Sequence, residues 1–472
     1  MTGEMAELAD DAEAAEAVGP GENAGLSRVL PPARVPDLRA HQRRYGPGGL
    51  RGRALTDETA RAGLTGRGGA AYPMARKIQA VRERAGLRGS VVIANGMESE
   101  PASAKDASLL ALAPHLVLDG IALAAEAAGA RSAYLCVRRP AQADALAAAV
   151  AERAGYDPVA VELALVPERY VASAESSLVR FLNGGPALPA FTPPRPFERG
   201  VRGRPTLVSN VETLANLALI SRHGAGWFRS AGTPSAPGTA LVTVSGAVRR
   251  PGVHEVAFGT PMRDVLALAG GAGEVGGVQA VLAGGFFGSW LPGGAALDTP
   301  AAPDALRSAG ASFGAGVFLV LPAWGCGLAE TARVVRYLAR QSAGQCGPCL
   351  NGLPAIADAF DQVAFGGPGG RGPGGGGPGG GGPGGGGPGG GGPGGRRGHD
   401  RALRWLRELC GLVEGRGACH LPDGVARLTA STLRVFADHI PAHAAGPCLA
   451  ARGRAAFPVP SGRREPEPGR AR

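Results

Sequence analysis

The chain has 472 residues, 44% of them hydrophobic, and a formal net charge of +10. Because one hydrophobic core usually serves about 100–200 residues, we expect roughly two to four domains. The arginines are scattered, and no basic run is interleaved with aromatic residues, which argues against a nucleic-acid-binding protein. No apolar run approaches the roughly 20 residues of a membrane-spanning helix, so we expect no direct membrane insertion.

Residues 1–25 are acidic and rich in alanine, and they lack the cationic start and apolar core of a signal peptide. We therefore expect a cytoplasmic protein in a reducing compartment, where cysteines serve as ligands, catalysts or core residues rather than as disulfides. The seven cysteines are Cys136, Cys326, Cys346, Cys349, Cys410, Cys419 and Cys448.

The basic residues are almost all arginine, and only Lys77 and Lys105 are lysines. Chance survival is one explanation. The other is that a compact ammonium group cannot be replaced by a planar guanidinium at a tight phosphate or carboxylate site. The neighbours of both lysines are therefore candidate site residues.

The first half of the chain alternates apolar runs such as "GSVVIANG" and "RSAYLCVRR" with helical stretches such as "SLLALAPHLVLDGIALAAEAAG". This alternation predicts a parallel sheet covered by helices. Residues 240–245 and 253–256 then predict two strands of a hairpin, followed by a helix over 262–269 and a buried strand at "AGVFLVLP". A hairpin followed at once by a helix resembles the β-grasp.

Beyond Cys326 the apolar residues follow a helical period up to Ser342, and further helices are predicted at "RALRWLRELCGLV" and "VARLTASTLRVFADHI". Between them, a tract from Gly366 to Gly395 carries a proline every five residues. Collagen needs glycine at every third residue, so we expect this tract to be an unfolded insertion.

Two stretches combine small, acidic and basic residues. In "LTGRGGAAYPMARK" these are Gly66, Arg67, Gly68, Gly69 and Lys77, and in "VVIANGMESEPASAKD" they are Asn95, Glu98, Glu100, Lys105 and Asp106. Small residues let backbone N–H groups approach an anion, so the first stretch is a candidate phosphate cradle, with an ordinary loop as the alternative. The second follows an apolar strand, where open α/β sheets bind ligands, with a solvated loop as the alternative.

Two later stretches read as helix starts. In "RPTLVSNVETLANL", Asn210 precedes a helix that carries Glu212 and Thr213, which is typical of a capped first turn. In "YVASAESSLVRFL", Glu175 is a first-turn carboxylate that a helix N-terminus favours.

Taken in this order, residues 55–440 resemble the NADH-binding flavoprotein subunit of respiratory complex I, a family shared with NAD-linked hydrogenases and formate dehydrogenases. The resemblance implies FMN and NAD(H) as cofactors. It implies a Rossmann-like α/β domain, then a β-grasp domain of the soluble-ligand-binding (SLBB) type, then a helical bundle with an iron-sulfur site. The implied cofactor-binding residues are Gly66, Arg67, Gly68, Gly69, Tyr72, Lys77, Asn95, Glu98, Glu100, Glu175, Asn210 and Thr213.

The implied boundaries follow the changes in pattern along the chain. They are a disordered acidic tail over 1–30, an FMN- and NADH-binding domain over 31–235, a β-grasp domain over 236–325, a helical iron-sulfur domain over 326–450 with a linker at 366–398, and a disordered tail over 451–472.

By this resemblance, NADH hands a hydride to FMN near Glu98, Glu100 and Glu175, and electrons pass to a cluster and then to a ferredoxin-like or complex I-like acceptor protein. Two acidic side chains of the family pattern are missing, because Met97 stands where the family has aspartate and Ala174 where it has glutamate. The alternative is therefore a degenerate homologue that binds flavin or cluster without oxidising NADH.

The stretch "SAGQCGPCLNG" contains a C-G-P-C pair that two chemistries use, a thiol-disulfide oxidoreductase and an iron-sulfur ligand loop. The family pattern S-C-G-x-C-x-x-C implies Cys346 and Cys349 as ligands of a 4Fe-4S cluster, with Cys419 in "CHLPD" as a third. Ala343 stands at the first cysteine of this pattern, and its side chain cannot bind iron. Candidates for a replacement are His420, Cys410 and Cys326, of which the two cysteines fit core packing better.

Overall fold

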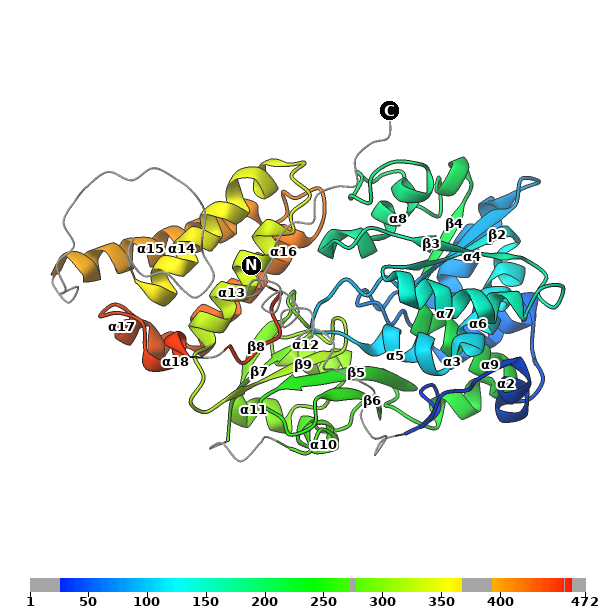
Figure 1. Ribbon diagram of the computed structural model, residues 1–472, viewed down its shortest axis with the longest axis horizontal. Helices are drawn as coiled ribbons and strands as arrows, with labels where there is room; N and C mark the ends of the chain where they lie inside the picture. Colours follow the sequence, from blue (N-terminus) through cyan, green and yellow to red (C-terminus); the bar gives the residue numbers. More distant parts are fainter. Residues whose placement is uncertain (1–25, 272–276, 367–392, 454, 461–472) are drawn as a thin grey trace, which may run out of the picture.

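The computed structural model describes residues 26–271, 277–366, 393–453 and 455–460. For residues 393–395 it describes the backbone alone. The proline-rich tract expected to be unfolded lies almost wholly outside these ranges. Three regions follow one another along the chain, an α/β domain, a small β-rich domain and a helical region (Figure 1). This order agrees with the predicted fold class.

The first domain is built on a four-stranded parallel sheet with the strand order β3-β2-β1-β4. The strands are β1 (Ser90–Asn95), β2 (Ala130–Val137), β3 (Val161–Leu165) and β4 (Thr206–Asn210). The central β1 is apolar and buried on both faces, as expected for a strand covered by helices on either side. Its last residue, Asn95, pairs with Cys136 of β2 and with Asn210 of β4, so these three residues form one row at the carboxyl edge.

Helices cover this sheet. They are α2 (Leu38–Tyr45), α3 (Gly52–Ala62), α4 (Met74–Ala85), α5 (Lys105–Leu112), α6 (Pro114–Ala128), α7 (Pro140–Ala151), α8 (Glu175–Leu182) and α9 (Val211–Arg229), with short 3₁₀ turns η1 (Tyr170–Ser173) and η2 (Val201–Gly203). The helices α6 and α9 pack closely because Gly120 has no side chain. A Cβ atom there would lie 2.1 Å from the Leu214 carbonyl oxygen.

The stretch that reads as one long helix is broken into α5 and α6. Pro114 begins α6, and its missing N–H and fixed φ suit the first position of a new helix. The two helices meet at 97°. Within the described residues no single helix is long and apolar enough to cross a membrane, although this bent pair reaches that length and composition when its two halves are taken together.

The β-rich domain has a five-stranded sheet with the order β6-β5-β9-β7-β8. Its elements are β5 (Thr239–Gly246), β6 (Gly252–Ala257), α10 (Met262–Leu268), β7 (Val278–Ala283), β8 (Ser289–Pro292), α11 (Gly293–Asp298), α12 (Pro303–Ser308) and β9 (Val317–Pro322). The predicted hairpin is β5 with β6, and the predicted buried strand is β9, which pairs in parallel with β5. The prediction of a β-grasp arrangement is confirmed.

The C-terminal region is helical and lies at the upper left of Figure 1, above the β-rich domain. Its elements are α13 (Gly327–Arg340), a short π-helical turn η3 (Pro348–Gly352), α14 (Leu353–Phe365), α15 (Pro393–Val413), α16 (Leu421–Val435), η4 (Ala437–His439), α17 (Ile440–His443) and α18 (Leu449–Arg452). Trp290 of β8 joins the two regions, because its indole N–H donates to Thr331 of α13 at 2.9 Å and its ring stacks on Phe457.

The expected disordered tails include described residues that are packed. Val29 and Leu30 are buried, and their backbone N–H groups donate to Glu255 at 2.8 and 3.0 Å. Phe457 is buried against Trp290. The boundaries predicted at residues 30 and 451 therefore cut into packed segments, because no local pattern reveals a distant carboxylate or aromatic partner.

Candidate functional site

The carboxyl edge of the parallel sheet brings together residues from several of the predicted stretches. Asn95 donates from its side chain to the Ser173 carbonyl at 2.9 Å, which attaches η1 to this edge. Asn210, at the end of β4, donates to Asp106 at 2.6 Å and accepts from the Glu212 N–H at 3.0 Å. The second contact is the predicted cap of α9.

The glycine loop lies directly against the end of β4. The Arg67 N–H donates to the Thr213 hydroxyl at 2.8 Å. A Cβ atom on Gly68 would lie 3.4 Å from the Cβ of Asn210, and Gly69 has a φ of +101°, which disfavours a side chain. The loop, Asn210 and Thr213 therefore form one continuous surface, and the absence of side chains at Gly68 and Gly69 allows that close approach.

Arg67 is a buried cation within this loop. Its guanidinium lies 4.5 Å from the centre of the Phe258 ring and donates to Thr65 at 3.1 Å. Its Nε has no hydrogen-bond partner among the described residues. Burial lowers the pKa of Arg67 to about 10, and Glu212 opposes that shift. A cavity of about 130 Å³ lies between the loop and the β-rich domain, with a lining that includes Gly66, Arg67, Gly69, Glu212, Phe258 and Phe313.

Lys105 is fully committed to contacts within the protein. Its ammonium donates to Asp106 at 2.7 Å, to Glu212 at 2.8 Å and to Asn210 at 3.3 Å. An ammonium has three N–H donors, so none remains for a ligand. Burial by itself lowers the pKa of Lys105, but Asp106 and Glu212 raise it by more than burial lowers it. The pKa of Lys105 therefore lies above its ordinary value. Lys105 therefore joins α5 to α9. The scarcity of lysine in the chain suggested a ligand contact, but the three contacts within the protein leave no donor for one.

Glu98 is held by the start of α5. Its carboxylate accepts from the Ser103 hydroxyl at 2.8 Å and from the N–H groups of Asp106 and Ala107, both at 2.9 Å. Its own backbone is strained, with a φ of +37°. Burial raises the pKa of Glu98, as does the charge of Asp106. Both carboxylate oxygens of Glu98 thus accept hydrogen bonds from the start of α5, and its catalytic role stays a prediction.

Glu100 links the first domain to the β-rich domain. One of its oxygens accepts from the Tyr170 hydroxyl at 2.8 Å and from the Phe286 N–H at 2.9 Å. Burial raises the pKa of Glu100 to about 7. Neither Tyr170 nor Phe286 was predicted as a site residue. Tyr170 begins the stretch that contains Glu175, but nothing in its spacing distinguishes it from a core aromatic residue.

Three predicted residues lie nearer to solvent. Lys77 donates to the Val208 carbonyl at 2.6 Å and forms an ion pair with Glu175. The two side chains are 26% and 46% exposed, and Tyr72 is 51% exposed. In contrast to Lys105, the ammonium of Lys77 has one N–H donor beyond its two contacts.

The loop after α13 approaches the start of α16. The sulfur of Cys346 accepts from the N–H groups of Ala418 and Cys349, and these contacts lower its pKa more than burial raises it. Burial raises the pKa of Cys349 to about 11, and the nearby Cys346 and Cys419 contribute. The three predicted ligands are thus neighbours, although the proline-rich tract separates two of them from the third. The helix α13, not a strand, leads into this loop.

The candidates for a fourth ligand differ in environment. Ala343 packs against the helical core. His420 is 95% exposed, and its Nδ1 lies 3.4 Å from Asp423. Burial raises the pKa of Cys410 to about 11, and the neighbouring Thr429 opposes that shift. Neither contact joins His420 or Cys410 to the other cysteines.

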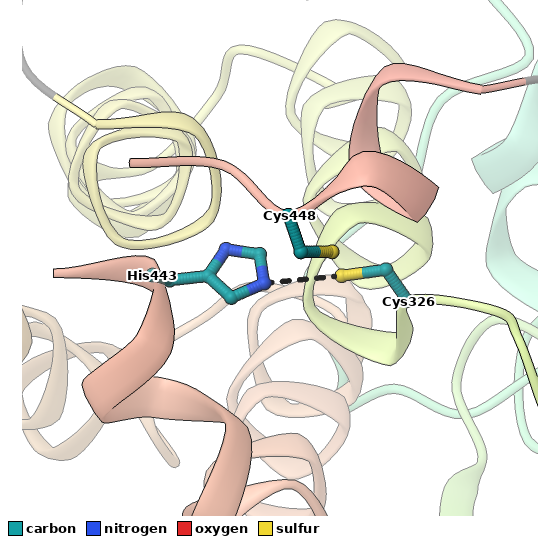
Figure 2. Close-up of side chains that lie close together, drawn as sticks. All are labelled: Cys326, His443 and Cys448. Carbon is teal, nitrogen blue, oxygen red and sulfur yellow. Dashed lines mark hydrogen bonds between the residues drawn. The ribbon is translucent and has the colours of Figure 1, made fainter. Parts of the chain in front are cut away.

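Cys326 is buried in the helical core, as its apolar context predicts, and it also lies beside a histidine and a second cysteine. Cys326 lies at the start of α13, where its sulfur accepts from the Ala329 N–H and lies 3.4 Å from Nε2 of His443. Cys448 lies beside them (Figure 2). Burial raises the pKa of Cys326 to about 12, and Cys448 contributes. Because 117 positions separate Cys326 from His443, no spacing rule predicts this group.

Comparisons with known proteins identify the family. Residues 59–219 match the Nuo51 FMN-binding domain and residues 241–285 the SLBB domain. A subunit of the NADH-quinone oxidoreductase of Mycobacterium tuberculosis is 28% identical over 82% of this chain and 83% of its own length. The corresponding NADH-quinone oxidoreductase subunit of Rhodobacter capsulatus is 32% identical over 66% of this chain and 76% of its own length.

A solved structure supports the same assignment. An NAD⁺-reducing [NiFe]-hydrogenase in the air-oxidized state has a TM-score of 0.71 and 29% identity over 84% of this chain. The match spans 63% of the hydrogenase chain, which is less than two thirds of its length. The resemblance seen in the sequence is thus confirmed, and the chain belongs to the family of the NADH-binding flavoprotein subunit of NADH-quinone oxidoreductase.

Proposed function

We propose that this chain is an NADH-oxidising electron-transfer subunit that uses FMN and a 4Fe-4S cluster and delivers electrons to a partner protein. The observation that carries the proposal is the meeting of the glycine loop with Asn95, Asn210 and Thr213 at the carboxyl edge of the sheet. All of them fall within the residues that match an FMN-binding domain.

The glycine loop fits an anionic, planar cofactor by its own chemistry. Gly68 and Gly69 leave backbone exposed beside Asn210, and Arg67 places a buried cation with an unbonded Nε among the residues that line the cavity. Lys77 adds a second cation with a free N–H donor at the open side. When bound, FMN supplies a group that accepts a hydride and releases electrons one at a time.

The acidic residues divide into two roles. Glu98 positions the connection between β1 and α5. Glu100 and Glu175 are the candidates for contact with NADH, the first held by Tyr170 and the second paired with the partly exposed Lys77. Burial raises the pKa of Glu100 to about 7, so its carboxyl group can exchange a proton near neutral pH.

The cysteine loop fits a cluster that has three protein thiolates. Backbone N–H groups already point at the Cys346 sulfur, and such hydrogen bonds favour a thiolate that binds iron. Cys349 and Cys419 would be the second and third protein ligands. Water or a small thiol would bind the iron that has no cysteine because of Ala343. Relatives named as subunits of a quinone oxidoreductase support an acceptor protein in a larger complex, and a ferredoxin-like protein is the simpler acceptor.

The test is anaerobic addition of NADH to purified protein loaded with FMN. We expect the visible absorbance of the flavin to bleach, both in the natural protein and in Cys346→Ser, whose change lies outside the flavin site. Retention of flavin without bleaching would contradict the proposal.

A second candidate function is a flavin-binding homologue without NADH oxidation. Met97 favours it, because this residue is completely buried in an apolar cluster where the family has a carboxylate. Ala174 similarly removes a carboxylate next to Glu175. Flavin that stays bound and oxidised after NADH addition is the result expected of this second function.

A further inference from the structure

We propose that Cys326, His443 and Cys448 bind a single Zn²⁺ ion at a site separate from the cysteine loop. Among the described residues, these three form the group in which every ligand atom lies within 4.8 Å of the others. Figure 2 shows the three side chains converging from the start of α13, from α17 and from the segment that begins α18. Two thiolates and an imidazole are a donor set that zinc prefers.

The spacing fits one tetrahedral ion. With Zn–S near 2.3 Å and Zn–N near 2.0–2.1 Å, a sulfur and a nitrogen on the same ion lie about 3.5 Å apart. The Cys326 sulfur and Nε2 of His443 are 3.4 Å apart. A cubane cluster instead places its thiolates on separate irons, which spreads them more widely than the ligands of one ion.

His443 is oriented as a metal ligand. Its Nδ1 lies 2.7 Å from the carbonyl oxygen of Ala364, which can only accept, so Nδ1 carries the proton. Nε2 then presents its lone pair toward Cys326. A backbone carbonyl that holds the other ring nitrogen in this way is the usual outer contact of a zinc-bound histidine.

This site lies far from the proposed cluster. Cys326 precedes α13, and Cys346 follows it. A helix of that length spans about 20 Å, so the two groups of cysteines lie near opposite ends of α13. One metal cannot use both groups.

The site would fasten the C-terminal segment to the rest of the chain. Cys448 immediately precedes α18, and beyond it the Ala456 N–H donates to Glu330 of α13 at 2.9 Å. Phe457 then stacks on Trp290. An ion shared by Cys326, His443 and Cys448 would tie this segment across the start of α13, next to the junction with the β-rich domain.

The experiment measures metal in the full-length protein purified without chelator. We expect about one zinc per chain. After zinc removal, Co²⁺ alone should bind with the near-ultraviolet absorbance of cobalt-thiolate bonds. Cys448→Ser, Cys326→Ser and His443→Gln should each weaken Co²⁺ binding by about 100-fold or more, because even outer contacts of a metal contribute up to that much. Cys410→Ser, on a half-buried cysteine of α15, is the matched control and should bind as the natural protein does.

Three results would overturn the proposal. They are the absence of zinc together with no cobalt-thiolate absorbance, ligand variants that bind Co²⁺ as tightly as the control, and a Cys326–Cys448 disulfide found by mass spectrometry in the native protein. Cys448→Ser keeps the test usable if the buried variants fail to fold, because Cys448 is only partly buried. Iron content and flavin bleaching of the same samples report separately on the proposed function, on which the zinc site does not rest.

Discussion

The carboxyl edge of the parallel sheet and the helical region are organised by different means. At the sheet edge, Asn95 and Asn210 come from strands 115 positions apart, yet parallel pairing places them in one row. In the helical region, Cys346 meets the segment of Cys419 only because α16 docks against the loop after α13. Parallel strands bring their ends together by topology, whereas helices joined by long connections do so only through packing.

The largest effect expected is on the metal content of the helical region. Cys349→Ala removes one of three thiolates from a cluster that already lacks a fourth, so the purified protein should retain little or no iron. Bleaching of FMN by NADH should survive, because the loop contacts the first domain through Gln345, which binds Arg180 and Pro189, and not through Cys349. Iron and sulfide analysis and stopped-flow absorbance would measure both.

The control for this variant is Cys136→Ala, a buried cysteine near the end of β2 in the first domain. It should keep its iron. Iron retained in Cys349→Ala would remove the basis for the cluster and leave the C-G-P-C pair to thiol chemistry.

The two lysines provide the next test, within the sheet edge itself. Lys105→Met leaves the buried Asp106 without its cation and Glu212 with only the 4.0 Å ion pair to Arg67, and loss of one partner of a buried ion group costs about 3–5 kcal/mol of folding free energy. Lys77→Met removes a half-exposed ion pair and should cost less than about 1 kcal/mol. It should instead weaken FMN binding about 10- to 100-fold through loss of a charged hydrogen bond.

Urea unfolding of FMN-free protein and fluorescence titration with FMN separate the two effects. Equal destabilisation by both substitutions would mean that Lys77 is also a structural residue. Normal FMN affinity in Lys77→Met would remove it from the proposed site.

A smaller gain is expected from restoring the missing cysteine. Ala343→Cys places a thiol where the family has a cluster ligand, and should raise iron content toward about four per chain and slow the loss of iron in air. Electron paramagnetic resonance of the reduced protein would detect the change. Ala315→Cys, another partly buried alanine beside the same core, is a control that should have no effect on iron.

The sequence predicts features that depend on neighbouring residues better than it predicts contacts between distant segments, and the reason is physical. Strand ends, the cap at Asn210 and the hairpin of β5 and β6 depend on neighbouring residues, and their positions were predicted. The contacts of Glu100 with Tyr170 and Phe286 and the group around His443 join distant segments, and no local pattern encodes them. Lys105 was singled out by its rarity, but only its three contacts reveal that it is structural.

The last test compares two buried carboxyl groups, Glu100 and Glu255. Burial raises the pKa of each to about 7 from an ordinary value of 4.5. The folded state therefore holds these two protons more tightly than the unfolded state, so the stability that the two groups contribute is greatest below pH 4.5 and is lost as the pH rises to 7. Each group contributes at most about 3 kcal/mol to that fall.

Glutamine mimics the protonated carboxyl, so Glu100→Gln and Glu255→Gln should each flatten the dependence of unfolding on pH between 5 and 8. Only Glu100 lies at the proposed NADH site, whereas Glu255 holds Val29 and Leu30 against the hairpin. Glu100→Gln should therefore also change the pH profile of flavin reduction by NADH, and Glu255→Gln should leave it unchanged. An identical change in both profiles would reduce Glu100 to a structural contact between two domains.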